Sequence, residues 1–344
     1  MKVVRVKEAG VLVIDEEQEP VIEKEDEVII QVISAGICGS DISIYQGTSP
    51  VAIYPRVIGH EFAGNVISAG ESVTDLKRGD HVVVNPVCSC GTCRVCQKGR
   101  GNVCANLNVL GVHLDGGYQE YVKVRRKNVF KISDQIPWEH AAIVEPYTVA
   151  AQVAIRGGIE KDDMVLICGS GQIALTILQI CNIIGAKCIM TDVIEERLKQ
   201  ALDFGALHVI RSDQEDVAAI VKSLTGGIGV DVAIDAACVG ITLKEAALSV
   251  RPAGVVVTMG FKEKDVQISE FLITSKELDI RGTRLNNHCF PQVIQWFEEK
   301  KIDPSKIITD RFQFTDITSA FDKIAEDPEN TMKIILTFGG EKAL

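Results

Sequence analysis

The chain has 344 residues, and its 36 Lys and Arg against 47 Asp and Glu give a formal net charge of −11 at pH 7. Its composition, 46% hydrophobic and 24% charged, is typical of a folded globular protein and excludes extensive disorder. The acidic charge argues against nucleic acid or an anionic membrane surface as a partner. At roughly 100–200 residues per domain, the length predicts about two domains.

The N-terminal sequence and the apolar runs bear on location. Lys2 and Arg5 stand where a signal peptide needs an apolar core, and no run approaches the roughly 18 uncharged residues that a spanning helix needs. We therefore expect a cytoplasmic protein without a membrane partner. The eleven cysteines are odd in number in a long chain without a signal peptide, which favours metal binding over disulfides.

The first part of the chain, to about residue 145, has the pattern of short β-strands separated by Gly, Asp and Pro. Apolar residues alternate with others, as in residues 28–33, which is typical of a barrel-like β domain. The predicted strands are 2–7, 11–14, 27–35, 65–69, 81–85 and 118–124.

From residue 164 on, apolar runs alternate with helix-length amphipathic stretches, which predicts βαβ units and a parallel sheet. The predicted strands are 165–168, 187–192, 208–210, 230–237, 254–260 and 278–281, and the predicted helices are 172–184, 195–204, 214–224 and 242–250. A tail follows after about residue 287, with helices at 291–300 and 317–326 and a strand at 333–338. It is too short for a domain, so we expect it to fold back onto one of the other two.

Cys90, Cys93, Cys96 and Cys104 are spaced like the ligands of a structural metal. Four thiolates in a loop that offers no hydrophobic core suit a closed tetrahedral zinc site that holds the loop together. The alternative is reduced cysteines packed in a core, but core packing gives no reason for this spacing. Cys88 lies two positions before Cys90, which strains a turn around one metal, so we expect it to take no part.

A second set combines Cys38, His60 and Glu61 with the distant Glu145. Each residue alone is weak evidence, because a lone Cys or His is usually a core or satisfied polar residue and a Glu before Pro usually begins a helix. Together they supply one sulfur, one nitrogen and one or two oxygen ligands. That is the incomplete shell of a catalytic zinc, with one position left for water or substrate.

A glycine-rich turn follows the predicted strand 165–168. It reads Gly169-Ser170-Gly171-Gln172-Ile173-Ala174, the G-x-G-x-x-A pattern of a dinucleotide site. The first two glycines allow a tight turn and the close approach of a pyrophosphate to the helix N-terminus. Asp192 ends the next strand, where it can accept hydrogen bonds from the adenosine ribose, which favours NAD over NADP. Arg197 either contacts the adenine or is a solvated arginine of its helix.

The order of these motifs, with Asp115-Gly116-Gly117-Tyr118 among them, resembles the zinc-dependent medium-chain alcohol and polyol dehydrogenases over essentially the whole chain. Sorbitol and threonine dehydrogenases are familiar members. The resemblance implies an α/β fold with a GroES-like β-rich catalytic domain at 1–149 and 288–344, a structural zinc lobe at about 88–105, and a Rossmann NAD-binding domain, a doubly wound parallel sheet, at 150–287. It also implies a homo-oligomer, a dimer or a tetramer.

The resemblance places Cys38, His60, Glu61 and Glu145 around the catalytic zinc, and it leaves open which glutamate contacts the metal. Ser40 is the expected acceptor of the substrate proton. Two departures from the family pattern stand out. Gln172 and Ala174 replace the Pro and Gly that relatives commonly carry, and Ser43 stands where many relatives have a relay histidine, so the proton route beyond Ser40 stays open.

Finer matches at 54–61, 109–113 and 284–286 resemble the sugar-acid branch, which contains L-gulonate and L-galactonate 5-dehydrogenases and starvation-sensing proteins. The implied substrate is a sugar acid oxidised at a secondary alcohol, with L-gulonate as first choice and L-galactonate as second. The residues expected to bind it are Arg56, His113, Arg284 and Asn286. Arg284 can equally be a strand-end arginine in a subunit contact.

Three other functions remain open from the sequence. A polyol or amino-alcohol dehydrogenase of the same fold needs no carboxylate on its substrate. A zinc-free quinone reductase is a different chemistry, against which Cys38, His60 and Glu145 argue. A non-enzymatic zinc or redox-sensing regulator is a different class of protein. NADH absorbance with a panel of sugar acids and polyols distinguishes these functions.

Overall fold

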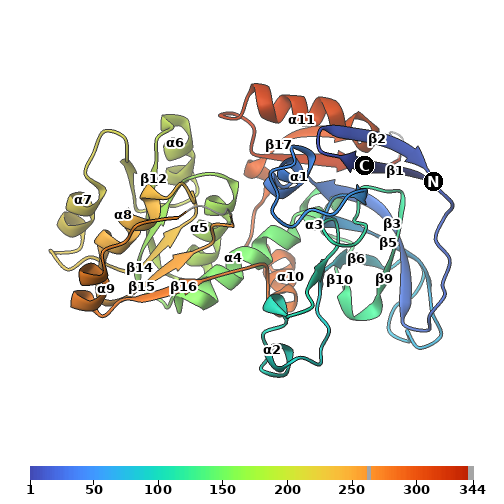
Figure 1. The fold of residues 1–344 in the computed structure, drawn as a ribbon, viewed down its shortest axis with the longest axis horizontal. Coiled ribbons are helices and arrows are strands. Elements are labelled where there is room, and N and C mark those ends of the chain that lie inside the picture. The colour runs from blue at the N-terminus through green and yellow to red at the C-terminus, as the bar shows by residue number, and fades with distance from the viewer. Residues whose placement is uncertain (262–264, 340–344) are drawn as a thin grey trace. The chain divides into compact units, whose positions relative to one another are not determined.

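The computed structural model describes residues 1–261 and 265–339, and the chain forms two compact units (Figure 1). The first unit comprises Met1–Thr148 and Asn286–Leu344, and the second comprises Val149–Leu285. The sequence analysis placed these boundaries after residues 149 and 287. The tail joins the first unit because its strand β18 (Lys333–Thr337) pairs antiparallel with β3 (Glu27–Gly36).

The largest sheet of the first unit has the strand order β10-β6-β5-β3-β18-β17, and β9 also pairs with β3. Its other strands are β5 Glu61–Ala69, β6 His81–Val84, β9 Tyr121–Arg125, β10 Val129–Lys131 and β17 Ile308–Gln313. Alternate apolar side chains of these strands meet in one core, which includes Ile30, Phe62, Tyr118 and Leu336, each almost fully buried. This core fixes the strands that carry the candidate site.

Smaller elements complete the first unit. A three-stranded sheet has the order β2-β1-β4, and β7 pairs with β8. These strands are β1 Lys2–Glu8, β2 Val11–Glu16, β4 Arg56–Val57, β7 Val87–Cys88 and β8 Asn108–Val109. The helices are α1 Gly39–Tyr45, α2 Arg94–Gln97, α3 Trp138–Ala142, α10 Phe290–Glu298 and α11 Ile317–Glu326, with 3-10 turns at Gly101–Val103, Arg126–Asn128, Ser305–Ile307 and Phe314–Asp316.

The second unit contains a six-stranded parallel sheet in the order β13-β12-β11-β14-β15-β16. Its strands are β11 Met164–Cys168, β12 Lys187–Asp192, β13 His208–Arg211, β14 Val230–Asp235, β15 Val250–Thr258 and β16 Asp279–Gly282. Counted from β11, this is the 3-2-1-4-5-6 order of a doubly wound fold, in which the order of successive strands reverses between β11 and β14 while all strands stay parallel. Ligands of such sheets bind at the carboxyl ends of the strands at this point.

The helices of the second unit connect these strands. They are α5 Gln172–Ile184, α6 Glu195–Asp203, α7 Val217–Leu224, α8 Ile241–Ser249 and α9 Glu270–Lys276. Helix α4 (Val144–Gly157) begins in the first unit and ends in the second. Throughout residues 1–261 and 265–339, the helices are too short or too polar to cross a lipid bilayer.

The structure confirms the α/β class with a β-rich part and a doubly wound parallel sheet, and it corrects several element bounds. The predicted helix 214–224 begins at Val217, because the Asp216 carboxylate accepts a hydrogen bond from the Ala219 amide and caps the helix there. The predicted strand 254–260 instead spans Val250–Thr258, since its pairing with β14 begins at Val250. Helix α4 was not predicted, because it is buried on nearly all sides and lacks the exposed polar face of a surface helix.

Candidate functional site

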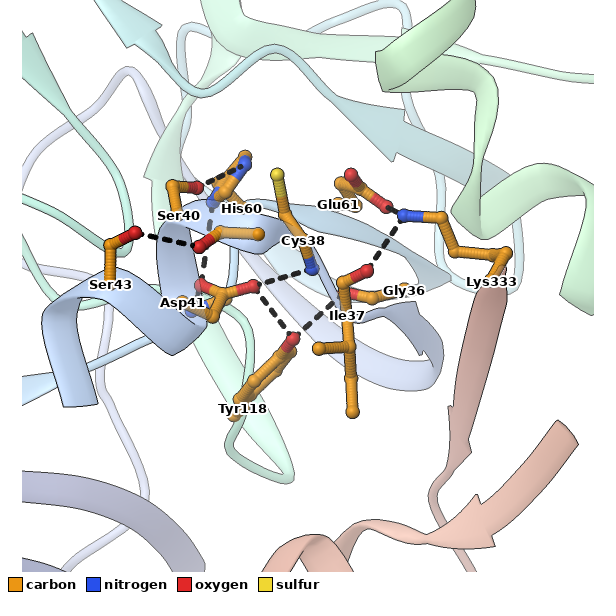
Figure 2. A network of polar contacts seen from close by, with 12 residues as sticks. Gly36, Ile37, Cys38, Ser40, Asp41, Ser43, His60, Glu61, Tyr118 and Lys333 are labelled. Atoms are coloured by element: carbon orange, nitrogen blue, oxygen red, sulfur yellow. Dashed lines mark hydrogen bonds and ion pairs between the residues drawn. The ribbon is translucent and has the colours of Figure 1, made fainter. Parts of the chain in front are cut away.

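Cys38, His60 and Glu61 lie at the adjacent ends of two paired strands. Strand β3 ends at Gly36, two residues before Cys38, and β5 begins at Glu61, directly after His60. Gly36 and Glu61 are partners in the β3–β5 register, so strand pairing brings the two segments together. One ligand atom from each of Cys38, His60 and Glu61 lies within 4.8 Å of the others (Figure 2).

Asp41 joins the backbone of Cys38 to the ring of His60. Its Oδ2 accepts hydrogen bonds from the Cys38 amide at 2.9 Å and the Tyr118 hydroxyl at 3.0 Å. Its Oδ1 accepts from the Gly59 amide at 3.2 Å and lies 3.6 Å from His60 Nδ1. Asp41 is fully buried, so this carboxylate fixes the first turn of α1 and orients the imidazole.

Ser40 and Ser43 lie on the same short helix but have different partners. The Ser40 Oγ lies 3.5 Å from His60 Nε2, next to the cluster of Cys38, His60 and Glu61. The Ser43 hydroxyl donates to the Gly39 carbonyl at 3.0 Å, a contact within the helix. Of the two serines, Ser40 is therefore the one whose hydroxyl lies next to the cluster.

The electrostatics of the cluster suit a cation. Burial opposes the protonated form of His60, but the neighbouring Asp41 and Cys38 raise the pKa of its imidazole well above the ordinary value. Burial raises the pKa of Glu145 to about 7, and His60 and Lys333 oppose this rise while Glu61 adds to it. One thiol, one imidazole and one carboxylate are ligands that zinc accepts, so the donor set fits this metal.

The two candidate glutamates differ in position. Within the described part of the chain, the ligand atoms of Cys38, His60 and Glu61 lie within 4.8 Å of one another. Glu145, on α4, does not belong to this cluster. Glu145 is buried and interacts electrostatically with His60, Glu61 and Lys333. The geometry therefore favours Glu61 over Glu145 as the carboxylate closest to the other two donors.

The sequence analysis assigned no role to three residues of this network: Asp41, Tyr118 and Lys333. Asp41 follows Cys38 by three residues, and an acidic residue in the first turn of a helix is a signal that the sequence does contain. Lys333 carries no such signal. Its partner Glu61 lies 272 positions away, so only the folded chain places the two together.

The four cysteines of the predicted lobe form a second cluster. Their Sγ atoms all lie within 4.8 Å of one another. The contacts are 3.4 Å for Cys90 and Cys104, 3.5 Å for Cys93 and Cys96, 3.9 Å for Cys93 and Cys104 and 4.0 Å for Cys90 and Cys96. A zinc–sulfur bond of about 2.3 Å places tetrahedral sulfurs about 3.8 Å apart, so these four sulfurs fit a closed zinc site.

The surroundings of the lobe explain why it needs a metal. Of the four ligands, only Cys104 is buried, so a hydrophobic core does not hold the loop. Hydrogen bonds from the backbone amides of Cys93 and Thr92 lower the pKa of the Cys90 thiol to about 5, which favours the thiolate that zinc binds. Cys88 lies outside the cluster, where its sulfur accepts a hydrogen bond from the Asn128 side-chain amide at 3.7 Å.

The glycine-rich turn of the second unit has the geometry of an anion site. Gly169 adopts a φ of +103°, which favours glycine, and its amide donates to the Thr191 carbonyl at 2.8 Å. Gly171 caps α5 without a side-chain hydrogen bond, and a Cβ placed there would meet nothing within 4 Å. The open space and the helix N-terminus, where Gln172 and Ile173 begin α5, therefore fit a pyrophosphate.

Asp192 lies beside this turn at the end of β12. Its Oδ2 accepts a hydrogen bond from the Ser170 amide at 2.7 Å, and its Oδ1 accepts from the amides of Val193 and Ile194 at 2.8 and 3.0 Å. A carboxylate has about four acceptor positions, so these three bonds orient it and leave about one position for the ribose. Arg197 lies five residues further on, in α6.

The residues expected to bind substrate have partners within their own units. Arg56 donates to Asp115 at 2.8 Å, the His113 Nδ1 accepts from the Val109 amide at 3.1 Å, and Asn286 donates to Asn85 at 3.2 Å. These three lie in the first unit. Arg284 lies in the second unit, with its guanidinium carbon 4.7 Å from the centre of the Phe261 ring. The ion pair with Asp115 offsets the charge that Arg56 would offer to an anion.

Comparison with known proteins identifies the family. The model of the alcohol dehydrogenase GroES-like domain matches residues 24–134, and the model of the zinc-binding dehydrogenase matches residues 173–299. The starvation-sensing protein RspB of Escherichia coli (strain K12) is 42% identical over 314 residues, which cover 91% of this chain and 92% of RspB. The chain belongs to the zinc-type alcohol dehydrogenase family.

Other similar proteins span both units of this zinc-type dehydrogenase. Sorbitol dehydrogenase of Bacillus subtilis (strain 168) is 31% identical, with 90% of each chain covered. L-galactonate-5-dehydrogenase of Escherichia coli (strain K12) is 30% identical, with 91% of this chain and 92% of that chain covered. The crystal structure of RspB from Escherichia coli CFT073, complexed with NADH, has a TM-score of 0.93 at 40% identity and covers 98% of this chain and 99% of that chain.

Family membership confirms four predictions made from the sequence. The first unit contains a GroES-like domain, as the resemblance implied. The protein is an oxidoreductase of the type that acts on a CH–OH group, and its cofactors are zinc and a nicotinamide dinucleotide. The resemblance to the alcohol and polyol dehydrogenases as a whole is confirmed, whereas the narrower sugar-acid branch stays a prediction.

We expect two zinc ions per chain by elemental analysis, one at each cysteine-containing cluster. Cys93→Ser should remove one zinc and lower the free energy of unfolding, because a metal that closes a loop contributes to folding. Cys38→Ser should remove the other zinc and abolish turnover with little change in the unfolding midpoint. Full activity of Cys38→Ser would contradict the catalytic site, and unchanged zinc content in both variants would contradict both sites.

Proposed function

We propose that this zinc-type dehydrogenase oxidises a secondary alcohol of a sugar acid to a ketone with NAD, with L-gulonate as the first candidate and L-galactonate as the second. The main support for this type of reaction is the cluster of Cys38, His60 and Glu61, with the Ser40 hydroxyl beside it. Three different donors at the ends of two strands leave a fourth position for a substrate oxygen, which is the arrangement of a catalytic zinc.

Cys38, His60 and Glu61 would hold the metal, and the buried Glu145 would complete or tune its shell. When bound, zinc supplies a Lewis acid for the substrate hydroxyl, and NAD supplies the hydride acceptor. Asp41 faces His60 Nδ1 at 3.6 Å, which leaves Nε2 as the nitrogen for the metal.

The proton of the substrate hydroxyl would pass to Ser40 Oγ. This oxygen is beside His60, whereas the Ser43 hydroxyl is bonded to the Gly39 carbonyl. Ser43 occupies the position of the relay histidine of many relatives, and its contact within the helix supports a proton route that leaves from Ser40 without it.

The cofactor site is proposed at the turn of Gly169, Ser170 and Gly171 and at Asp192. The open N-terminus of α5 would receive the pyrophosphate, and the Asp192 carboxylate would accept hydrogen bonds from the adenosine ribose. A 2′-phosphate would meet the negative charge of Asp192, so we infer a preference for NAD. Similarity of fold does not distinguish the two cofactors, because similar structures include an RspB with NADH and a Sinorhizobium meliloti dehydrogenase bound to NADP. The inferred preference for NAD therefore rests on the charge of Asp192.

The substrate is the finer part of the proposal. Similarity to L-galactonate-5-dehydrogenase and the motifs around Arg56, His113, Arg284 and Asn286 support a sugar acid. A polyol is the second candidate. Similarity to sorbitol dehydrogenase supports it, and so does the ion pair of Arg56 with Asp115, which reduces the positive charge available for a carboxylate.

Ser40→Ala should lower the rate of alcohol oxidation by about 10²- to 10⁴-fold, because the substrate proton loses its acceptor. Ser43→Ala is the matched control on the same helix and should retain most of the activity. Steady-state NADH formation measures both variants. An unchanged rate in Ser40→Ala would mean that water reaches the substrate hydroxyl directly.

Asp192→Ser should narrow the preference for NAD by raising kcat/KM with NADP, because the charge that repels a 2′-phosphate is removed. The measurement is the ratio of kcat/KM for the two cofactors at a saturating alcohol concentration. Asp192→Glu keeps the charge and should keep the preference. Equal use of the two cofactors by the unmutated enzyme would contradict the proposed role.

The substrate is tested by kinetics with L-gulonate, L-galactonate and sorbitol. A charge-assisted contact with a carboxylate contributes about 1.5–3 kcal/mol, so replacing the arginine that makes it should lower kcat/KM for the acid by about ten- to a hundredfold and spare sorbitol. Arg56→Ala and Arg284→Ala are the variants to compare. A clear preference of the unmutated enzyme for sorbitol would assign it to the polyol dehydrogenases.

A further inference from the structure

Lys333 is a lysine with no exposed surface, and its charge lies next to the candidate metal site. Its Nζ donates to the Glu61 Oε2 at 2.6 Å and to the Ile37 carbonyl at 2.8 Å (Figure 2). The side chains of Lys333 and Glu61 are 0% and 2% exposed. Lysine is almost never fully buried unless it is paired, so this residue requires an explanation.

Stability alone explains the pair poorly. Removing two charges from water costs about as much as their attraction returns, and buried ion pairs can often be replaced by apolar side chains without loss of stability. Lys333 is also the first residue of β18, and the apolar residues Ile334, Ile335 and Leu336 follow it. An apolar residue at this position would be the simpler choice for the core. The charge is therefore better explained by what it does to Glu61.

The two contacts of Lys333 join the two segments that carry the metal donors. Ile37 directly precedes Cys38, and Glu61 directly follows His60. Strand β18 thus connects the end of β3 to the start of β5 through one ammonium group. A backbone hydrogen bond adds a second contact between β18 and the Cys38 segment, since the Ile37 amide donates to the Ile334 carbonyl at 3.0 Å.

The carboxylate of Glu61 is also confined on its other side. A Cβ on Gly36 would lie 2.3 Å from Glu61 Oε2 and 3.2 Å from an Ile143 methyl group, so only a glycine at position 36 leaves room for this oxygen. Oε2 is thereby held between the Gly36 backbone and the Lys333 ammonium group. The orientation of Glu61 is fixed, and its negative charge is balanced by one positive charge.

We propose that Lys333 is a positioning residue for the dehydrogenase reaction. It fixes Glu61 and the Cys38 segment in one geometry, and it reduces the negative charge that Glu61 presents to a metal held with Cys38 and His60. A less fully neutralised metal withdraws more electron density from a substrate hydroxyl. This inference rests on the proposed function, because it concerns the same metal site.

The test replaces zinc with cobalt(II), whose visible absorption depends on the geometry of its ligands. The spectrum of the unmutated protein minus that of Cys38→Ser isolates the contribution of the Cys38 site from that of the four-cysteine site. Lys333→Met should change the position and intensity of these difference bands and lower kcat by about ten- to a hundredfold, as expected for a residue that orients a ligand. Lys333→Arg keeps the charge and should restore most of both properties.

Lys123→Met is the matched control in the same unit. Lys123 has the same pattern of contacts, because its Nζ donates to the Glu23 carboxylate at 2.5 Å and to the Val21 carbonyl at 3.2 Å. The Lys123→Met variant should leave the difference bands and kcat unchanged. If Lys333→Met does not fold, Gly36→Ala provides the second variant, because it displaces the same Oε2 while Lys333 stays in place, and it should change the same bands.

The outcomes distinguish an error in the proposed metal site from an error in the role of Lys333. If Cys38→Ser leaves the cobalt spectrum and the metal content unchanged, the proposed metal site is wrong, and with it the inference. If Cys38→Ser removes the bands but Lys333→Met, or Gly36→Ala in its place, leaves them as in the unmutated protein, the site stands and Lys333 is only a structural ion pair. Changed bands in Lys333→Met with native bands in Lys123→Met support the positioning role.

Discussion

The pairing of β3 with β5 is the constraint on which the candidate site depends. Their register sets Gly36 opposite Glu61, so that Cys38, two residues past the end of one strand, meets His60 and Glu61 at the start of the other. A register shift of one residue would turn Glu61 to the other face of the sheet. The apolar core around Ile30 and Phe62 fixes that register, and hydrophobic burial in the first unit thereby determines the position of the metal donors.

The two clusters of donors illustrate two ways to build a metal site. The four cysteines lie within fifteen positions of one another, in a loop with little buried surface, and the metal supplies the cohesion that a core would give elsewhere. The cluster of Cys38, His60 and Glu61 is built on strand ends that the core already holds. Its donors are therefore oriented before a metal binds, and Asp41 and Tyr118 fix that orientation further.

The residues around the cluster of Cys38, His60 and Glu61 must balance one another's charges. Asp41, Glu61 and Glu145 are buried acids within one small region, which is costly unless cations offset them. Lys333 supplies one positive charge, and the surroundings of His60 favour a second. A metal ion completes this balance, since its positive charge replaces a proton on the imidazole. The electrostatics thus favour a cation at the place where the donor atoms converge.

The sequence by itself determined whatever depends on local spacing or periodicity. Helix α5, strand β12 and helix α11 have the predicted bounds, because capping residues and apolar periods mark them locally. The sequence also predicted the cysteine lobe and the glycine-rich turn, since the residues of each motif are close along the chain. Only the tertiary structure decided which donors meet across β3 and β5, that Arg56 pairs with Asp115, and that Lys333 lies beside Glu61. These contacts join residues far apart in sequence, and their partners are chosen by strand register and core packing, which no local pattern encodes.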